Sequence, residues 1–311
     1  FDGKNYTISN LTSTETAEKA DGYICAGLFG AIYGNAVVKN FTLENVTINT
    51  SGFKGNNASA VVGFAYEATG SVENVKVTGN INAAKVSGVG AIVGYAHKSS
   101  MTITGCEVTG ATITGAAYVG GIIGYSTVDV LNDNTVVNVE VDATSCVAGI
   151  MLNGGSASNN TVKEVTLTSE HANWQNAIGA VVGCITEKVT VENNTIEDVN
   201  TTALVGSEHK DKPTTPVAKV QARIGNTYYA ALKTATSAAQ ASEVITLIAD
   251  VEADYALNIT SALDLNGHSL IATVAPTALP EGYAALPNLD GKFVIGAQPT
   301  ATVNNLGMTT V

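Results

Sequence analysis

Short apolar blocks that end in glycine recur along the first two hundred residues of the chain. Each block is followed by an asparagine-centred turn and then by alternating Val, Thr and Ile residues. The six blocks occupy residues 27–30, 60–63, 90–94, 121–124, 149–152 and 179–183. Successive blocks close 28 to 33 residues apart, and such a period is typical of stacked units that bury their apolar faces against one another.

The second half of each repeat aligns on one turn position. Residues that favour left-handed or bridge backbone conformations occupy it: Asn40, Asn74, Gly105, Asp133, Asn159 and Asn193. Apolar residues alternate with polar ones after this turn, as in Phe41 and Leu43, which is the period of a strand with one buried face. We expect the side chains of this column to close their own turns and to hydrogen-bond along the stack.

These elements predict an all-β chain that contains a right-handed parallel β-helix of about six coils. Three short strands and three bends fit into about thirty residues, whereas propeller blades need about forty, and leucine-rich repeats need a leucine ladder that this chain lacks. The closing glycines Gly63, Gly94 and Gly124 are expected where the backbone bends or where the next wall leaves no room for a side chain, and Gly30 and Gly183 are further structural positions of the repeat. In the fifth copy Leu152 replaces the glycine, so we expect an irregular coil there.

Proline marks a boundary. All six prolines lie at or after Pro213, and proline is excluded from central strands. The pattern predicts the β-helix over residues 1–206, a charged linker over 207–216 and a smaller unit over 217–311. That unit is expected to hold one short helix near 229–240, with Leu232 and Ala235 facing inward, and a few strands.

The strands expected in this second unit cover residues 219–224, 243–248, 263–270 (with a turn) and 292–295. A helix at the mouth of a solenoid protects open strand edges. The unit is therefore also a candidate for the capped start of a second solenoid.

Composition narrows the function. The net charge is −12 and the chain has a single arginine, Arg223, so we expect no nucleic-acid partner. No run of eighteen apolar residues occurs, so no membrane span is expected. The chain opens on Phe1 without a visible signal peptide, which suggests a piece of a longer protein.

The four cysteines are far apart in the sequence and show no C-x-x-C spacing. A secreted disulfide framework would be denser in so long a chain. We therefore predict buried free thiols at Cys25, Cys106, Cys146 and Cys184 rather than bridges or ligands, with Cys106 pointing into the core.

The glycine blocks followed by asparagine turns resemble the GLUG repeats of bacterial surface proteins. Residues 1–8 resemble the coil that often opens such arrays, and residues 219–270 are similar to a module of surface proteins from gut Bacteroidetes. The two resemblances cover most of the chain up to about residue 275. They imply a pectin-lyase-like β-helix that is extracellular or attached to the cell surface at the outer membrane, with an adhesive or scaffolding role.

Many β-helices are lyases or hydrolases, so catalysis has to be considered. A hydrolase needs paired carboxylates, but the aspartates of the repeats fall at different phases of the coil: Asp2, Asp21, Asp129, Asp133, Asp142 and Asp198. The histidines lie in unrelated segments without metal-ligand spacing: His97, His171, His209 and His268. We expect His97 to be solvated in a turn and His268 to be structural. The sequence thus predicts no enzyme, no metal and no cofactor.

Tyrosines gather around the glycine blocks and are the candidate binding feature. Tyr66, Tyr95 and Tyr125 closely follow the closing glycines, and Tyr95 and Tyr125 should stack on adjacent coils. Stacked rings serve either as packing, which we favour, or as a platform for sugar rings. Trp174, in a loop-like segment, is a further contact candidate.

The function predicted from these features is a non-catalytic surface scaffold or adhesin segment. A carbohydrate-binding or carbohydrate-active β-helix is the alternative. The partner in either case would be a host or dietary glycan, or a surface protein.

Overall fold

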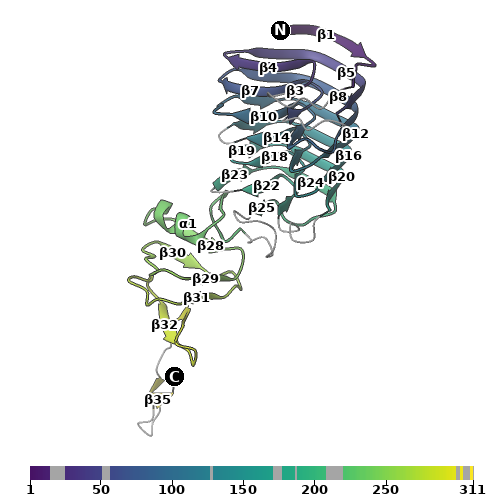
Figure 1. Cartoon of the computed structure of the whole chain (residues 1–311). Coiled ribbons are helices and arrows are strands. Elements are labelled where there is room, and N and C mark those ends of the chain that lie inside the picture. The colour runs from purple at the N-terminus through teal and green to yellow at the C-terminus, as the bar shows by residue number, and fades with distance from the viewer. Residues whose placement is uncertain are drawn as a thin grey trace, which may run out of the picture. The chain divides into compact units, whose positions relative to one another are not determined.

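The chain winds into a β-solenoid of about five turns, followed by a smaller unit with one short helix (Figure 1). The computed structural model describes residues 1–14, 25–50, 57–126, 129–170, 177–185, 188–207, 220–298, 302–303 and 309–310. Strands account for 62% of the chain and helix for 3%, which confirms the predicted all-β parallel β-helix. The chain comprises two compact units, residues 1–219 and 220–311; residues 208–216 of the predicted linker lie outside the described residues.

Wall A of the solenoid is its longest sheet. Two continuous strands, β5 (Val37–Asn49) and β8 (Ser71–Ala83), give way in later coils to a short and a long strand. The short strands are β11 (Thr102–Thr104), β15 (Val130–Asn132), β19 (Gly155–Ser158) and β23 (Lys188–Glu192). The long strands are β12 (Glu107–Gly115), β16 (Thr135–Ala143), β20 (Thr161–Ser169) and β24 (Thr195–Val199). At the N-terminal end β1 (Asp2–Ser9) and β2 (Thr12–Thr14) pair with β5.

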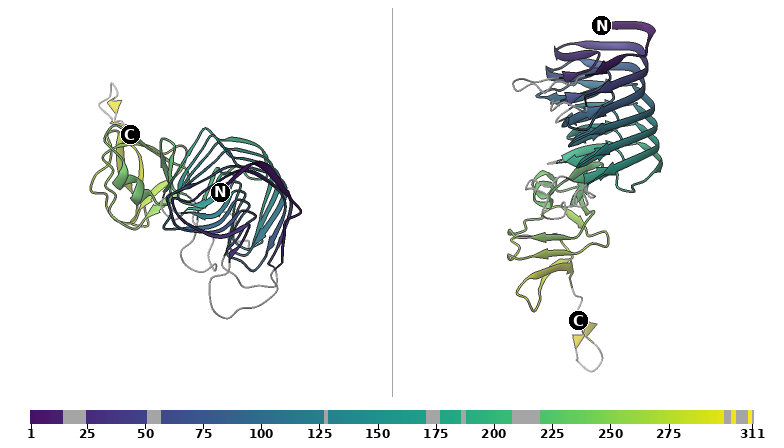
Figure 2. Two further views of the ribbon diagram at one scale, coloured as in Figure 1. Left: turned by 90° about the horizontal axis from the view of Figure 1, so that it is seen from above. Right: turned by 45° about the vertical axis from the view of Figure 1, so that its right-hand side comes forward.

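Walls B and C are made of shorter strands, all parallel from coil to coil. Wall B consists of β3 (Cys25–Ala26), β6 (Asn57–Ala58), β9 (Gly88–Gly90), β13 (Tyr118–Gly120), β17 (Cys146–Ala148) and β21 (Ile178–Gly179). Wall C consists of β4 (Phe29–Gly34), β7 (Val62–Ala68), β10 (Val93–His97), β14 (Ile123–Ser126), β18 (Met151–Asn153), β22 (Val182–Ile185) and β25 (Val205–Ser207). Figure 2 (left) looks along the stack and shows successive coils superimposed.

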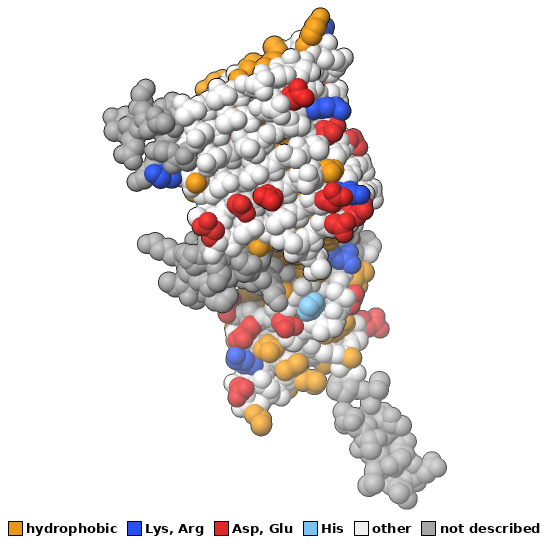
Figure 3. Space-filling view, turned by 90° about the vertical axis from the view of Figure 1, so that its right-hand side faces the viewer, with side chains coloured by type: hydrophobic (Ala, Val, Ile, Leu, Met, Phe, Trp, Pro, Cys, Tyr) orange, Lys and Arg blue, Asp and Glu red, His pale blue; other side chains and the backbone are white. Residues whose placement is uncertain are grey.

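The core is built from columns of identical phase. Ile48, Ile81 and Ile113 lie in register across wall A and are buried, with at most 1% of each residue exposed. Threonines and other polar residues occupy the alternate, outward positions of the long strands, so one face of each strand packs in the core and the other faces solvent. Figure 3 shows such a face, on which acidic side chains are scattered among uncharged residues.

The asparagine column separates the short and long segments of wall A. All six members have positive φ, between 52° and 62°, the left-handed conformation that the residue types predicted. Hydrogen bonds along this column join Asn74 Nδ2 to Asn40 Oδ1 (3.2 Å) and Asn40 Nδ2 to Asp2 Oδ1 (3.2 Å).

A second ladder, which the sequence analysis missed, runs through the buried column one residue later. Asn134 Nδ2 donates to Asn160 Oδ1 (3.0 Å), and Asn160 Nδ2 donates to Asn194 Oδ1 (2.9 Å). The same oxygens accept the backbone N–H groups of Asn134 and Asn160. Asn134 and Asn160 are fully buried, so these bonds satisfy amides that would otherwise be costly to desolvate.

The closing glycines fit against the backbone of wall B. A Cβ atom on Gly94 would lie 2.6 Å from Gly63 O and 2.9 Å from Ala58 N, and one on Gly124 would lie even closer to Val89 N. Gly63 is equally confined, by Cys25 Cβ and Ala26 O. Gly30 differs, because it is exposed and its nearest such neighbour is 3.6 Å away. Close approach of two walls, rather than a special dihedral, therefore explains the buried glycines.

The irregular coil expected at Leu152 is present in the backbone. The pairing of β14 with β18 shifts register between Ile123 and Ser126, whose partners are Met151 and Asn153. At the end of the repeats a seventh apolar block, Ala203-Leu204-Val205-Gly206, leads into β25, which begins at Val205. It closes 23 residues after Gly183, because the residues between β24 and β25 form no strand in wall B. This shortened step hid it from the repeat pattern.

The second unit has its own buried core around α1 (Leu232–Ala238), which is shorter than the predicted 229–240 helix. Leu232 and Ala235 face inward as predicted. The predicted strands appear as β26 (Ala222–Ile224), β28 (Val244–Leu247), β30 (Ala262–Asp264), β31 (Leu270–Ala272) and β33 (Phe293–Ala297). Five further strands were not predicted: β27 (Thr227–Tyr229), β29 (Val251–Ala253), β32 (Tyr283–Pro287), β34 (Thr302–Val303) and β35 (Thr309–Thr310).

Pairing in this unit is mixed. Strands β28 and β30 pair in parallel, as do β29 and β31, whereas β26 pairs with β27 and β28 in antiparallel fashion. The two parallel pairs form a short second stack.

Candidate functional site

Wall C displays aromatic side chains in two columns because its strands are in register. Phe64, Tyr95 and Tyr125 occupy one set of paired positions on β7, β10 and β14. Two residues further along each strand, Tyr33, Tyr66 and His97 occupy the next set on β4, β7 and β10. Side chains two residues apart lie on the same face of a strand, so both columns share one face, and the intervening Ala65 and Ala96 are buried in the core.

The rings of the two columns contact one another. Tyr95 and Tyr125 stack with their centroids 4.6 Å apart and planes 11° apart, and Tyr66 stacks on His97 at 5.8 Å and 18°. Stacked pairs cover each other's faces, so packing accounts for part of this cluster.

Tyr33 is arranged differently from the stacked pairs. Its ring is inclined by 70° to that of Tyr66 at 6.0 Å, and 61% of the residue is exposed. Tyr33 therefore offers an open ring surface at one end of the cluster.

Wall B supplies the polar side of the site. A groove of about 650 Å³ is lined by Tyr33, Phe64, Tyr66, Tyr95 and His97 from wall C, and by Asn57 and Ser87 from β6 and the turn before β9. A Cβ atom on Gly88 would lie 2.9 Å from Tyr95 Cδ2 and from Asn57 Oδ1, two lining residues. The two walls thus approach each other closely at Gly88, next to the lining residue Ser87.

The described residues that line the groove carry little charge. The described lining residues carry no carboxylate, ammonium or guanidinium group. Lys98 lies at the edge, with its Nζ 5.7 Å from the Tyr66 ring centroid and 3.8 Å from Glu67 Oε1. Asn57 is buried and donates a weak hydrogen bond to Cys25 Sγ at 3.8 Å; burial raises the pKa of that thiol.

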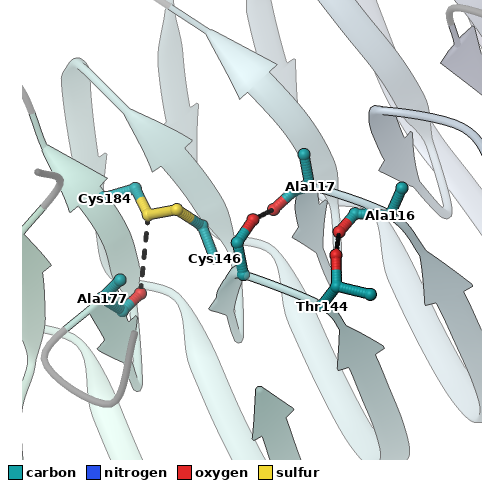
Figure 4. Close-up of a disulfide and its surroundings, with 7 residues drawn as sticks. Ala116, Ala117, Thr144, Cys146, Ala177 and Cys184 are labelled. Carbon is teal, nitrogen blue, oxygen red and sulfur yellow. Dashed lines mark hydrogen bonds between the residues drawn. A yellow bond between two sulfur atoms is a disulfide. The ribbon is translucent and has the colours of Figure 1, made fainter. Parts of the chain in front are cut away.

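A disulfide lies further along the same corner between walls B and C. Cys146 on β17 is bonded to Cys184 on β22, with their Cα atoms 5.9 Å apart (Figure 4). Cys146 is paired in register with Tyr118, whose ring packs against the Tyr125 ring at 5.2 Å. The disulfide and the aromatic rings therefore belong to one continuous seam.

The prediction of four free thiols is wrong for this pair. Cys146 and Cys184 are 38 residues apart in sequence, and only the coil register brings wall B of one turn beside wall C of the next. Cys25 and Cys106 are free. Cys106 points into the core as predicted, where burial raises the pKa of its thiol to about 12.

Other predicted residues fall as follows. Tyr66 and Tyr95 line the groove, and Tyr125 stacks beneath Tyr95. Trp174, like Asp21, His171 and His209, lies outside the described residues. His97 is exposed as expected, but it ends β10 instead of occupying a turn, and it lines the groove. His268 lies in a turn, with Nδ1 3.5 Å from Asp250 Oδ1.

The described aspartates of the repeats have different structural roles. Asp133 and Asp198 have positive φ, and Asp2 pairs with Lys4. Asp129 is fully buried and accepts hydrogen bonds from Ser126 Oγ (2.6 Å) and Met101 N (2.8 Å). In the part of the chain that is described, no three His, Cys, Asp or Glu side chains gather as a metal site would require.

Sequence reasoning missed Phe64, Asn57 and Ser87 as lining residues, and it did not single out Tyr33 or His97 for binding. Phe64 directly follows Gly63 just as Tyr95 follows Gly94, so the repeat alignment carried that signal. Nothing in the repeat pattern marks Asn57 or Ser87, because their role depends on wall B passing beside wall C.

Comparisons with known proteins give one structural likeness. A solved structure described as "a putative immunoglobulin A1 protease from Bacteroides ovatus" is 20% identical, with a TM-score of 0.47. The match covers 69% of this chain and 66% of that one, just under two thirds of its length. No protein-family model and no curated protein matches the chain. No helix among the described residues has the length and hydrophobicity to cross a membrane.

Proposed function

We propose that this chain is a non-catalytic β-solenoid module of a surface protein, and that it binds its partner through the aromatic groove. The observation that carries the proposal is the ring-lined groove at the corner of walls B and C. Concave sites with apolar and aromatic walls and a few convergent polar groups are the usual form of binding sites.

The chemistry of the groove favours binding over catalysis. Its described lining offers aromatic rings, the phenolic hydroxyls of three tyrosines, the hydroxyl of Ser87, one amide and one imidazole. Glycoside hydrolysis commonly uses two carboxylates facing the same bond, and the buried carboxylate of Asp129 is instead engaged by Ser126 and Met101. A module with these groups holds a ligand without cleaving it.

An extracellular or cell-surface location is part of the proposal. The Cys146–Cys184 disulfide supports it, because disulfides persist mainly in oxidising compartments. The similarity of the repeats to those of bacterial surface proteins points the same way. Repetition along a stiff solenoid also suits a scaffold that carries a binding face away from its attachment point.

A retention assay tests the proposal. Purified protein is passed over immobilised mucin, and the same preparation is incubated with pectin, glycosaminoglycan and mucin glycans. We expect retention on mucin and no new fragments from any substrate. Reproducible cleavage by protein free of contaminating activity would contradict the non-catalytic assignment. Absence of retention on mucin and on every other immobilised surface component would contradict the binding role.

A further inference from the structure

The shape of the groove limits what can enter it. Its volume of about 650 Å³ lies within the range of about 300–1,000 Å³ that is usual for small-ligand sites. An intact protein domain cannot enter such a space, but a short segment of a chain can.

The backbone around the groove argues against a peptide strand. Peptides commonly add a strand to a free sheet edge. Here β7 is paired on both sides, by β4 and β10, and β10 is paired by β7 and β14. The ladder hydrogen bonds of β7 and β10 are therefore already used within the solenoid, whereas β4 ends the sheet of wall C. A ligand that lies over β7 and β10 has to be recognised through side chains.

Charge argues against an ionic ligand. None of the described lining residues carries a full charge other than His97 when protonated, and the whole chain has a net charge of −12. An anionic ligand would be repelled by the protein as a whole. Among the described residues, Lys98 places an ammonium group against a lining ring, at the edge of the groove. A strongly cationic ligand would find no carboxylate among the described lining residues.

The remaining chemistry combines open ring surface with uncharged hydrogen-bonding groups. Tyr33 presents its ring to solvent, whereas the amide of Asn57, the hydroxyl of Ser87 and the imidazole of His97 line the same groove. A pyranose ring has one face of C–H groups, which packs on an aromatic ring, and a periphery of hydroxyls, which need neutral donors and acceptors.

We propose that the groove binds one end of a neutral oligosaccharide. In this site, Tyr33 stacks on a sugar ring, Tyr66 and Phe64 form the apolar side, and Asn57, Ser87 and His97 hydrogen-bond to sugar hydroxyls. The inference rests on the proposed binding function and names its ligand class. Single-site affinity should be modest, because one stacked ring and a few exposed hydrogen bonds contribute little after desolvation, and presentation of several copies would strengthen it.

The experiment uses the full chain and an array of neutral and acidic oligosaccharides of two to six units. It also includes an array of aromatic and proline-rich peptides. Titration calorimetry with the best neutral oligosaccharide then compares wild type with Tyr33→Ala, Tyr33→Phe and Ser87→Ala. Tyr6→Ala is the matched control, because Tyr6 is 75% exposed on β1 and is not among the groove residues.

We expect neutral oligosaccharides to bind and Tyr33→Ala to weaken binding about tenfold, the loss of one ring contact. Tyr33→Phe should change affinity by less than about twofold, since the ring remains, and Ser87→Ala should weaken it several-fold through a lost hydrogen bond. Tyr6→Ala should bind like wild type, and all variants should keep the wild-type melting temperature.

Three results would overturn the inference: binding only to acidic glycans, binding only to peptides, or neutral-glycan affinity that is the same in Tyr33→Ala and Tyr6→Ala. Removal of the neutral sugars from the mucin layer separates this inference from the broader proposal. Retention that survives this removal would refute the sugar ligand and leave the binding role intact, whereas a wild-type protein that is retained on no surface would refute both.

Discussion

At single positions, the distance from a side chain to the backbone of the neighbouring wall decides what is tolerated. Gly94 and Gly30 hold equivalent places in the repeat, yet a Cβ atom meets backbone at 2.6 Å in one and at 3.6 Å in the other. The immediate neighbours also decide whether a polar group is tolerated in the core. Asp129 is tolerated in the core because Ser126 and Met101 donate to its carboxylate, which offsets part of its desolvation.

We expect Gly94→Val to lower the free energy of unfolding by about 3 kcal/mol, the upper end of the usual cost of overpacking. The surrounding atoms are backbone and cannot rotate away. Gly30→Ala is the control and should be nearly neutral, because ordinary contact distances surround that position. Urea unfolding of both variants measures the difference, and equal stabilities would contradict the wall register described above.

Asp129 should give the protein a distinctive pH dependence. Burial raises its pKa above the ordinary value of 3.8, although hydrogen bonds from Ser126 and Met101 oppose the shift. The folded state therefore binds this proton more tightly than the unfolded state. The stabilising contribution of protonated Asp129 is fully present below pH 3.8 and is lost as the pH rises through the pKa of the folded state.

Asp129→Asn keeps an oxygen acceptor but does not ionise, so it isolates this contribution. The stability of wild type minus that of Asp129→Asn should fall as the pH rises from 3.8, the ordinary carboxyl value, through the raised pKa of the folded state. Urea unfolding of both proteins across this range measures it. A difference that grows with pH would show that the carboxylate is stabilised, and not destabilised, by its surroundings.

At the level of elements, ladders and bridges hold successive coils together. The Asn134–Asn160–Asn194 ladder satisfies backbone and side-chain groups inside the stack, and the disulfide joins β17 to β22. Both devices connect segments that are 26 to 38 residues apart. Each therefore stabilises the coil register and not a single strand.

Asn160→Ala should cost about 2–4 kcal/mol, because it leaves Leu131 O, Asn134 N and the Asn134 amide without their buried partner. Thr166→Ala is the control, because Thr166 is exposed on β20, the strand that follows Asn160. It should stay within about 0.5 kcal/mol of wild type. Thermal and urea unfolding report both values. A nearly neutral Asn160→Ala would mean that water replaces the ladder.

Thiol titration tests the bridge directly. Denatured protein without reductant should expose two thiols per chain, those of Cys25 and Cys106, and reduction should raise the number to four. Cys146→Ser with Cys184→Ser should lower stability by about 4 kcal/mol, the loop-closure contribution expected for a separation of 38 residues. Four reactive thiols before reduction would refute the bridge.

At the level of the whole molecule, the solenoid is a one-dimensional stack in which each coil contacts mainly its neighbours. Strand β12 is paired by β8 and β16, whereas β24 ends its sheet and is paired with β20. Stability in such stacks is close to a sum of coil and interface contributions, and terminal units open first.

Hydrogen exchange should therefore grade along the solenoid. Amides of β12 and β16 are expected to exchange at least about tenfold more slowly than those of β24 under native conditions. Strand β20, with pairing on both sides, should behave like the interior and serves as the internal reference. Uniform protection from β12 to β24 would indicate one fully cooperative unit.

The sequence by itself determined the repeat, its wall pattern and its turn column. A period near thirty residues, alternation of apolar positions and residues suited to positive φ at one position are local properties, and they dictated the β-helix, the left-handed turns and the inward Cys106. The stacking of Tyr95 on Tyr125 followed in the same way, because equal offsets from two glycines place two rings in register.

Only the tertiary structure decided what walls B and C bring together across coils. The Cys146–Cys184 bridge and the groove with Asn57 and Ser87 depend on how closely the two walls approach. That approach is set by packing of the completed stack, so residues about 30 positions apart become neighbours without any mark in their local sequence. The repeat predicts which residues share a column, but the distance between columns of different walls emerges only when the coils close.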